Sequence, residues 1–222
     1  MEHQSNTIVL LHGILRTDNC MRKLEIYFER NGYKTLNIHY PSRTQAIEDL
    51  AEDFLSAKLK DLSIEGKIHF VTHSMGGLLL HAYLAKHKIP NLGRVVMLSP
   101  PHNGSEIVDF FKRHKNLNYI FKKIFGPAGQ QLATDDSESF VNQKKYNVHY
   151  DLGIIAGSKV INPAGYALIK KASDGTVSVD STKIKGMRDH ITLPVDHLFM
   201  VKDKNVISQA LYFIEHGAFC KD

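Results

Sequence analysis

The sequence predicts an α/β fold in which a mostly parallel central sheet carries helices on both faces. Short, unbroken apolar segments alternate with longer segments of helical periodicity, which is typical of buried strands joined by crossover helices. A second observation is the sequence His73-Ser74-Met75-Gly76-Gly77, which directly follows one of the apolar segments. A serine followed by two glycines at this place is typical of a strand that turns sharply into a helix.

The predicted strands are short apolar segments that end at turn residues. The first, residues 7–11, ends at His12-Gly13, and its continuous apolar side chains suit a strand covered on both faces. The same criteria select residues 34–39, 67–72, 94–98, 150–156 and 190–193.

The predicted helices lie between these strands. In residues 21–30, Leu24, Tyr27 and Phe28 share one face at helical spacing, and Asn31-Gly32 supplies a stop signal. Comparable patterns predict helices at residues 47–62, 74–87 and about 204–215.

The alternation lapses in residues 106–150, where a basic amphipathic helix leads through the loop 126–129 into a polar stretch. We expect a lid-like insertion at this place. Two interpretations of its apolar stripe remain open. The stripe belongs to a core-packed helix with a solvated basic face, or it covers the ligand site and contacts an anionic lipid surface. In the second case Phe110 and Phe111 belong to the substrate-binding site.

Three polar segments stand at the ends of predicted strands. His12-Gly13 follows the first strand, His73-Ser74 the third, and the loop that contains His102 the fourth. Because ligands of parallel sheets bind beyond the carboxyl ends of the strands, we expect a substrate site there, with His12, His73 and His102 beside it.

Composition is that of an ordinary globular protein, with 222 residues, 43% hydrophobic and 23% charged. We expect one domain over residues 1–222. The polar start and the lack of an apolar run approaching about 18 to 20 residues predict neither signal peptide nor membrane span, and hence a cytoplasmic protein. A net charge of +5 permits peripheral contact with anionic membranes.

Other ligand classes are not expected. No nucleic-acid motif accompanies the positive charge, so we predict no nucleic-acid partner. The 13 histidines show no metal-binding spacing, and we predict no metal and no cofactor. Cys20 and Cys220 have no motif spacing; reduced thiols are expected, and a terminal disulfide remains the alternative.

A serine nucleophile needs a base within hydrogen-bond reach and an acid that orients the base. In this fold class the chain order is serine, acid, histidine, and Ser74, Asp174 and His197 satisfy it. Asp174 stands in an Asp-Gly turn past a predicted strand, and His197 precedes the last predicted helix. We therefore predict that these three residues are catalytic.

Several other residues compete for the acid and base roles. Asp151 lies at the start of a strand, Asp180 lies further along the chain, and Asp196 adjoins the histidine that it would have to orient. Adjacent side chains on an extended segment point apart. His190 lies inside a predicted strand, and His102 precedes the acid in sequence, so both are poorer candidates for the base.

Acyl transfer also requires two N–H donors that face the developing oxyanion. The residue after the nucleophile, Met75, supplies one. The loop after the first strand has Gly13 where backbone must approach closely, which nominates the N–H of Ile14 as the other. We expect His12 to support this loop and not to transfer protons.

These motifs together resemble those of α/β-hydrolase lipases, over roughly residues 7–215. The closest likeness is to the bacterial triacylglycerol lipase/esterase group, which also includes the inositol-deacylase relatives. The motifs that carry the resemblance are Leu11-His12-Gly13, Thr72-His73-Ser74-Met75-Gly76-Gly77, residues 99–105, Asp174-Gly175-Thr176-Val177-Ser178 and Asp196-His197-Leu198.

The resemblance implies a cofactor-free serine hydrolase of small-molecule or lipid carboxylic esters. In that group Ser74, Asp174 and His197 would form the triad, and Ile14 and Met75 the oxyanion hole. Two features depart from the pattern: Thr72 replaces the usual small residue, and the chain is short for a secreted lipase. Two alternatives are an acyltransferase or amide-directed deacylase with the same triad, and an inactive scaffold that binds a lipid or a partner.

Overall fold

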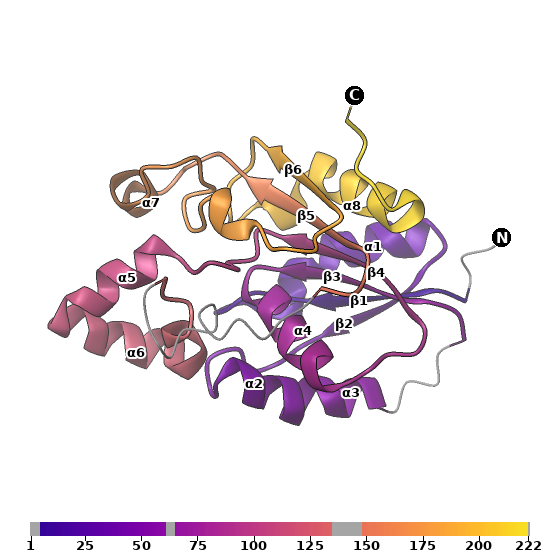
Figure 1. Ribbon diagram of the computed structural model, residues 1–222, viewed down its shortest axis with the longest axis horizontal. Helices are drawn as coiled ribbons and strands as arrows, with labels where there is room; N and C mark the ends of the chain where they lie inside the picture. Colours follow the sequence, from indigo (N-terminus) through magenta and orange to yellow (C-terminus); the bar gives the residue numbers. More distant parts are fainter. Residues whose placement is uncertain (1–4, 61–64, 135–147, 222) are drawn as a thin grey trace.

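The computed structural model describes residues 5–60, 65–134 and 148–221. In this part of the chain the strands form one six-stranded sheet with the order β2-β1-β3-β4-β5-β6, and every neighbouring pair is parallel (Figure 1). The predicted fold class is therefore confirmed. The strands are β1 (Thr7–Leu11), β2 (Lys34–Ile38), β3 (Ile68–His73), β4 (Leu92–Leu98), β5 (Leu152–Gly157) and β6 (Asp189–Leu193).

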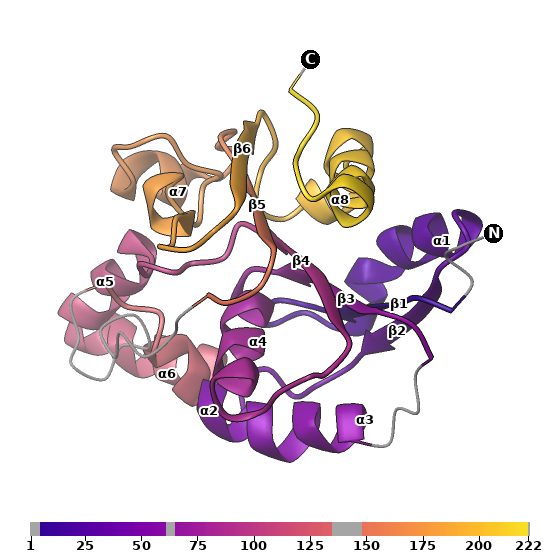
Figure 2. The same ribbon diagram turned by 45° about the vertical axis from the view of Figure 1, so that its right-hand side comes forward.

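Helices cover both faces of the sheet because successive strand side chains point to opposite sides. Ile8 and Leu10 of β1 belong to the hydrophobic cluster beneath α1 (Arg22–Arg30) and α8 (Lys204–His216). Val9 and Leu11 belong to the cluster on the other face. That face is covered by α2 (Ile47–Leu50), the π-helical segment η2 (Ala51–Ser56), α3 (Ala57–Lys60) and α4 (Met75–Lys86), as Figure 2 shows.

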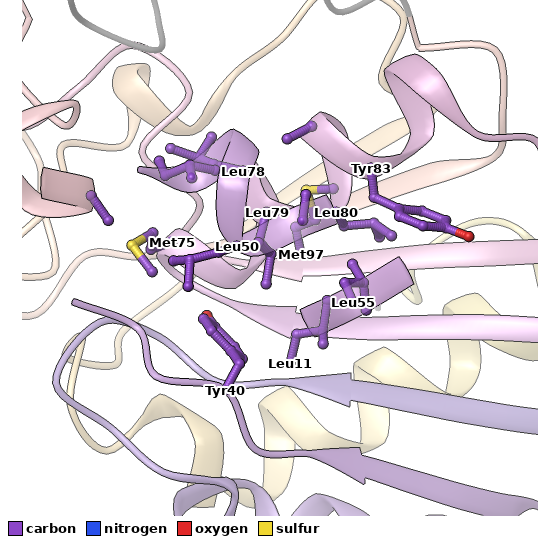
Figure 3. Packing of buried hydrophobic residues seen from close by; sticks show 14 of the residues in the cluster. Leu11, Tyr40, Leu50, Leu55, Met75, Leu78, Leu79, Leu80, Tyr83 and Met97 are labelled. Atoms are coloured by element: carbon purple, nitrogen blue, oxygen red, sulfur yellow. The ribbon is translucent and has the colours of Figure 1, made fainter. Parts of the chain in front are cut away.

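The helix α4 is buried on all sides over its first turns. The consecutive residues Leu78, Leu79 and Leu80 are all buried, and they pack with Leu11 and Met97 of the neighbouring strands (Figure 3). A helix that is apolar all round belongs in a core. Burial of each leucine contributes about 1.5–3 kcal/mol, so the start of α4 is held rigidly.

Further elements complete the described part of the chain. They are η1 (Asp18–Met21), α5 (Glu106–Arg113), α6 (Lys115–Gln130), α7 (Pro163–Leu168), η4 (Asp180–Thr182) and η5 (Met200–Lys202). The helices α5, α6 and α7 lie beyond the carboxyl ends of the strands (Figure 1). None of the helices in the described residues is long and apolar enough to cross a membrane.

The predicted insertion is helical over most of residues 106–130, with one correction. The loop expected at residues 126–129 is only a break within α6: Gly126 has φ 64°, and helix resumes directly at Pro127. A Cβ at Gly126 would meet the carbonyl oxygen of Arg43, so this sharp break requires glycine. The predicted polar continuation at residues 135–147 lies outside the described residues, as do residues 61–64 at the end of the predicted helix 47–62.

The segment before Asp174 also differs from expectation. The helix α7 was not predicted, although Asn162 caps it by accepting from the Gly165 N–H and Pro163 opens it. Asp174 therefore follows a helix and does not directly follow a strand. Its loop is closed by an isolated antiparallel bridge between Ser173 and Ser178.

Candidate active site

The corner between β3 and α4 holds Ser74 in a strained conformation, with φ 54° and ψ −127°. A non-glycine residue in this region costs roughly 1–3 kcal/mol, which the buried start of α4 can sustain. The turn is possible because Gly76 has no side chain: a Cβ there would lie 2.7 Å from the carbonyl oxygens of Leu11 and His12. The strand and the helix thus approach closely, and the serine at the corner between them faces the cavity described below.

Thr72, the departure from the usual small residue, is accommodated at the same corner. Its side chain is fully buried and faces Gly77, where a Cβ would lie 3.3 Å from the Thr72 Oγ1. Because Gly77 has no Cβ, the extra atoms of the threonine fit without displacing the serine.

Ser74, His197 and Asp174 form a continuous line of hydrogen bonds. The Nε2 of His197 lies 3.0 Å from the Ser74 Oγ, and its Nδ1 lies 2.6 Å from the Asp174 Oδ2. All three side chains are buried. Since an ionised carboxylate can only accept, Nδ1 carries the proton and Nε2 accepts from the serine hydroxyl. This is the tautomer in which the imidazole can take the serine proton.

The carboxylate of Asp174 is held ionised by its surroundings. Burial alone would raise its pKa, but the nearby His197 and the hydrogen bonds that the carboxylate accepts lower that pKa below the ordinary value. Its Oδ1 accepts from the backbone N–H groups of Thr176 (2.9 Å) and Val177 (2.8 Å). These two bonds leave Oδ2 aimed at the histidine.

His73 is the last residue of β3, and its side chain contacts the loop that carries His197. Its Nε2 donates to the backbone carbonyl of His197 over 2.9 Å, and the two rings lie 4.8 Å apart. Burial, followed by the nearness of His197, lowers the pKa of His73 to about 3. A neutral His73 can support the neighbouring base without adding a second positive charge.

The competing acids have other partners. Asp151 pairs with Arg188 at 2.8 Å, and Asp180 pairs with Lys183 at 3.0 Å. Asp196 accepts from the backbone N–H groups of the residues two and three places further along. Of the four aspartates weighed from the sequence, Asp174 is the one in contact with His197.

His102 and His190 also lie apart from Ser74. His102 donates from Nδ1 to the Thr182 carbonyl (2.7 Å) and accepts at Nε2 from His81 (2.8 Å). The Nδ1 of His81 in turn accepts from the Tyr150 hydroxyl at 2.7 Å. His190 lies 2.9 Å from the Thr182 hydroxyl. The sequence prediction missed the buried His81–His102 pair, because its partners come from separate parts of the chain.

The loop after β1 passes directly against the Ser74 corner. A Cβ at Gly13 would lie 3.1 Å from the Ser74 Cβ and from the His73 Nδ1. Within the described residues, neither the Ile14 N–H nor the Met75 N–H donates a hydrogen bond. Both predicted donors therefore remain free for an oxyanion. Ile14 and Met75 follow β1 and β3, which are neighbours in the sheet. From β1 the chain passes to β2 on one side, and it then returns to β3 on the other side, so ligands are expected to bind at this point.

A cavity of about 430 Å³ opens beside the serine. Ser74, His73 and His197 line it. Of Phe110 and Phe111, the two insertion residues expected at the substrate site, Phe111 lines it. Its other apolar lining comes mostly from α5 and α6 and the turn after them: Ile107, Val108, Phe121, Phe125 and Leu132. The sequence prediction missed Arg16, Asn162 and Thr176, which also line it.

Three residues expected at the substrate site are not among those that line this cavity: His12, His102 and Phe110. His12 is fully buried and stacks on the Tyr40 ring at 4.2 Å. Its Nδ1 donates to the Gly13 carbonyl (2.8 Å), and burial lowers its pKa. His12 therefore packs within the core and contacts the loop after β1.

Within the described residues, no group of three or more histidine, cysteine or acidic side chains is arranged to hold a metal ion. Cys20 and Cys220 are free thiols. The arrangement at Ser74 has the groups that acyl transfer requires. A serine hydroxyl contacts an imidazole, a carboxylate contacts the other imidazole nitrogen, and an apolar cavity lies beside them.

Comparison with known proteins bears on the fold. A family model described as "alpha/beta hydrolase fold" matches residues 6–148. No curated protein matches the chain. Among solved structures, the mature form of the Bacillus licheniformis lipase BlEst2 is similar, with a TM-score of 0.76 and 22% identity over 94% of this chain and 91% of that one.

Two further structures are similar at lower identity. The metagenomic carboxyl esterase MGS0156 has a TM-score of 0.76 and 18% identity over 96% of this chain and 76% of its own. Phospholipase PlaB from Legionella pneumophila has a TM-score of 0.70 and 17% identity. The match extends over 96% of this chain and 59% of the PlaB chain. At such identities the likeness concerns the fold.

Proposed function

The chain belongs to the alpha/beta hydrolase fold family, and from that premise we propose that it hydrolyses carboxylic esters with Ser74 as nucleophile. The observation that carries this proposal is the line of hydrogen bonds from Ser74 through His197 to Asp174, at the edge of an apolar cavity. The same line would serve any acyl transfer, and the cavity favours an apolar acyl group.

In the first half of the reaction, the Ser74 Oγ attacks the ester carbonyl while His197 Nε2 takes the hydroxyl proton. The N–H groups of Ile14 and Met75 stabilise the oxyanion of the tetrahedral intermediate. The intermediate collapses to an acyl-serine, and His197 returns its proton to the departing alcohol. Asp174 holds the imidazole in the Nδ1–H tautomer throughout.

In the second half, water takes the place of the alcohol. His197 Nε2 takes a proton from the water as the water oxygen attacks the acyl-serine carbonyl. The tetrahedral intermediate then collapses, His197 returns the proton to the Ser74 Oγ, and the carboxylic acid leaves. An alcohol or amine in place of water would make the protein an acyltransferase, and an amide in place of the ester would make it a deacylase. Both alternatives use the same residues and differ in the acceptor or the leaving group.

A fluorophosphonate probe tests the nucleophile directly, because it labels only a serine activated by its neighbours. We expect the wild type to be labelled and Ser74→Ala to be unlabelled, with the exposed Ser208→Ala as a labelled control. An unlabelled wild type would favour the inactive scaffold. Esters of graded acyl length, with release of free acid measured against transfer to added alcohol, would then separate hydrolase from acyltransferase.

The outer surface of α6 supports a further proposal: the protein binds a lipid surface and takes its substrate from that surface. Tyr119, Ile120 and Ile124 are exposed apolar side chains on this helix, and the lysines Lys122 and Lys123 lie exposed beside them. Apolar side chains flanked by lysines suit peripheral contact with anionic lipid. The helix lies beyond the carboxyl ends of the strands, so such contact would bring the cavity near the membrane (Figure 2).

A further inference from the structure

The loop that follows β1 carries an arginine into the wall of the cavity. The Arg16 N–H donates to the Gly13 carbonyl over 3.3 Å, which closes a tight turn. Leu15 within this turn has φ 57°, a left-handed conformation that is unusual for leucine. The Leu15 N–H donates to the Ser42 Oγ at 3.1 Å, which helps to hold the turn. A strained turn that is fastened in this way fixes where the Arg16 side chain begins.

Arg16 is the charged residue in the cavity wall. Among the described residues that line the cavity, it is the only lysine, arginine, aspartate or glutamate, and its side chain is half-buried. Its guanidinium makes no hydrogen bond or ion pair with another residue in the described part of the chain. By contrast, Arg22 pairs with Glu25, and Arg188 pairs with Asp151.

An unpaired, half-buried guanidinium next to apolar side chains is poorly solvated by the protein. Five N–H donors in a planar fork match a carboxylate or a phosphate, which can accept two of them at once. The positive charge also acts on the site itself, since it is one of the groups that lower the pKa of His73, after burial and His197. Arg16 and Ser74 line the same cavity of about 430 Å³, so one small substrate can contact both residues.

We propose that Arg16 selects ester substrates that carry an anionic group, a carboxylate or a phosphate, a few bonds from the scissile carbonyl. The inference rests on the proposed ester hydrolysis at Ser74 and narrows its substrate class. The apolar wall from α5 and α6 holds the hydrocarbon part of the substrate, and Arg16 binds the anion.

The test compares esters that differ in charge and are otherwise similar. On the acyl side the pair is 4-nitrophenyl hydrogen adipate and 4-nitrophenyl hexanoate. On the alcohol side the pair is 1-hexanoylglycerol 3-phosphate and 1-hexanoylglycerol. The quantity measured is the ratio of kcat/KM for the anionic ester to kcat/KM for the neutral ester, so that differences in overall activity between variants cancel.

We expect Arg16→Gln to lower this ratio about tenfold in at least one pair, which is the size of a single charge-assisted hydrogen bond. Arg16→Lys should keep part of the preference, because it keeps the charge and loses the fork. The matched control is Arg113→Gln, which removes one exposed arginine from α5 outside the cavity and should leave the ratio unchanged. High salt should reduce the wild-type ratio.

The outcomes distinguish the selection of anionic esters by Arg16 from ester hydrolysis at Ser74. A fall confined to the adipate pair assigns the anion to the acyl chain, and a fall confined to the phosphate pair assigns it to the alcohol. An equal ratio in wild type and in folded Arg16→Gln, for both pairs, would overturn the role of Arg16 while leaving ester hydrolysis intact. A wild type that hydrolyses none of the four esters would count against Ser74 chemistry itself, and the Arg16 assignment would fall with it.

Discussion

His73 donates a hydrogen bond from Nε2 to the backbone carbonyl of His197 over 2.9 Å, and it is also the residue immediately before Ser74. One side chain therefore links the strand that leads into Ser74 to the loop that carries His197. His73 and His197 are 124 residues apart in sequence, and this bond holds the end of β3 against the loop that carries His197. His197 lies in the segment between β6 and α8, and its contact with the Ser74 Oγ at 3.0 Å places this segment beside the end of β3.

We predict that His73→Phe lowers kcat about 10- to 100-fold while KM changes little, because a small displacement of the base affects the reacting geometry more than binding. His73→Gln, which can still donate to the His197 carbonyl, should recover part of the loss. Steady-state kinetics on a short-chain ester measures both constants. A change confined to KM would instead give His73 a role in substrate contact.

Ser74→Ala and His197→Ala should each reduce ester hydrolysis by at least about 10³-fold. Members of such a unit depend on one another, so the double variant should be no worse than either single variant. Both variants should unfold at a temperature close to that of the wild type, measured by thermal denaturation. Retention of more than a few per cent of activity in His197→Ala would make another histidine the base.

Asp174→Asn should also lose most activity, by about 10³- to 10⁴-fold, since an amide at this place favours the wrong imidazole tautomer. Asp180→Asn is the matched control, because Asp180 is exposed and pairs with Lys183 at 3.0 Å. We expect the control to retain wild-type rates in the same assay. Greater sensitivity at Asp180 or Asp151 than at Asp174 would contradict the assignment of the acid.

How far the sequence predicted the site depended on whether the signal was local. Ser74 was recognisable because the strand, the corner and the two glycines are contiguous. Asp174 and His197 were selected through chain order, and the structure brings their side chains together with that of Ser74. Arg16 was missed because its place in the cavity wall results from a strained turn at Leu15, and no local pattern predicts a leucine with positive φ.

The sequence also did not determine which apolar residues of the insertion face the cavity. Helical spacing placed Phe110 and Phe111 together at the substrate site, yet adjacent residues on a helix point about 100° apart. In the structure Phe111 lines the cavity and stacks on Phe121 at 5.3 Å, whereas Phe110 packs against His114 at 4.5 Å. Which of two neighbours faces inward is decided by the element that packs against the helix.

Stability should fall as the pH is lowered from about 6.5 towards 4. Burial lowers the pKa of His102 to about 4 and of His73 to about 3, and it also lowers the pKa of His81. An unfolded chain binds protons at these residues near pH 6.5, so below that pH the unfolded state binds more protons than the folded state. Each such histidine then reduces the free energy of unfolding by up to about 1.4 kcal/mol per pH unit.

Denaturant unfolding between pH 4.5 and 7.5 measures this slope. His102→Gln should reduce the slope by about one proton, and His216→Gln, which alters an exposed histidine at the end of α8, should leave it unchanged. If His102→Gln is too unstable for denaturant titration, the slope can be obtained from hydrogen exchange of the wild type over the same range. A stability independent of pH between 6.5 and 4.5 would contradict the assignment of neutral, buried histidines.

The last prediction concerns lipid contact by α6. One side of this helix is buried and lines the cavity, and the other side is exposed. Phe121 is buried at 3% exposure and Phe125 lines the cavity, whereas Ile120 is 52% exposed and Ile124 is 41% exposed. Residues four apart share a helix face, so Ile120 and Ile124 form one outward face. We expect Ile120→Ser/Ile124→Ser to weaken sedimentation with phosphatidylglycerol vesicles and to reduce the stimulation of long-chain ester hydrolysis by those vesicles.

Hydrolysis of a soluble short-chain ester should change less than twofold in this variant, because neither side chain lines the cavity. Phe111→Ser should behave differently and lower both activities, since Phe111 forms part of the cavity wall. Tyr212→Ser on α8 removes an exposed aromatic ring outside the cavity lining and serves as the control. If the wild type binds neutral and anionic vesicles equally weakly, and the isoleucine variant matches it, the outward face of α6 is an ordinary solvated surface. The protein would then act on dissolved esters.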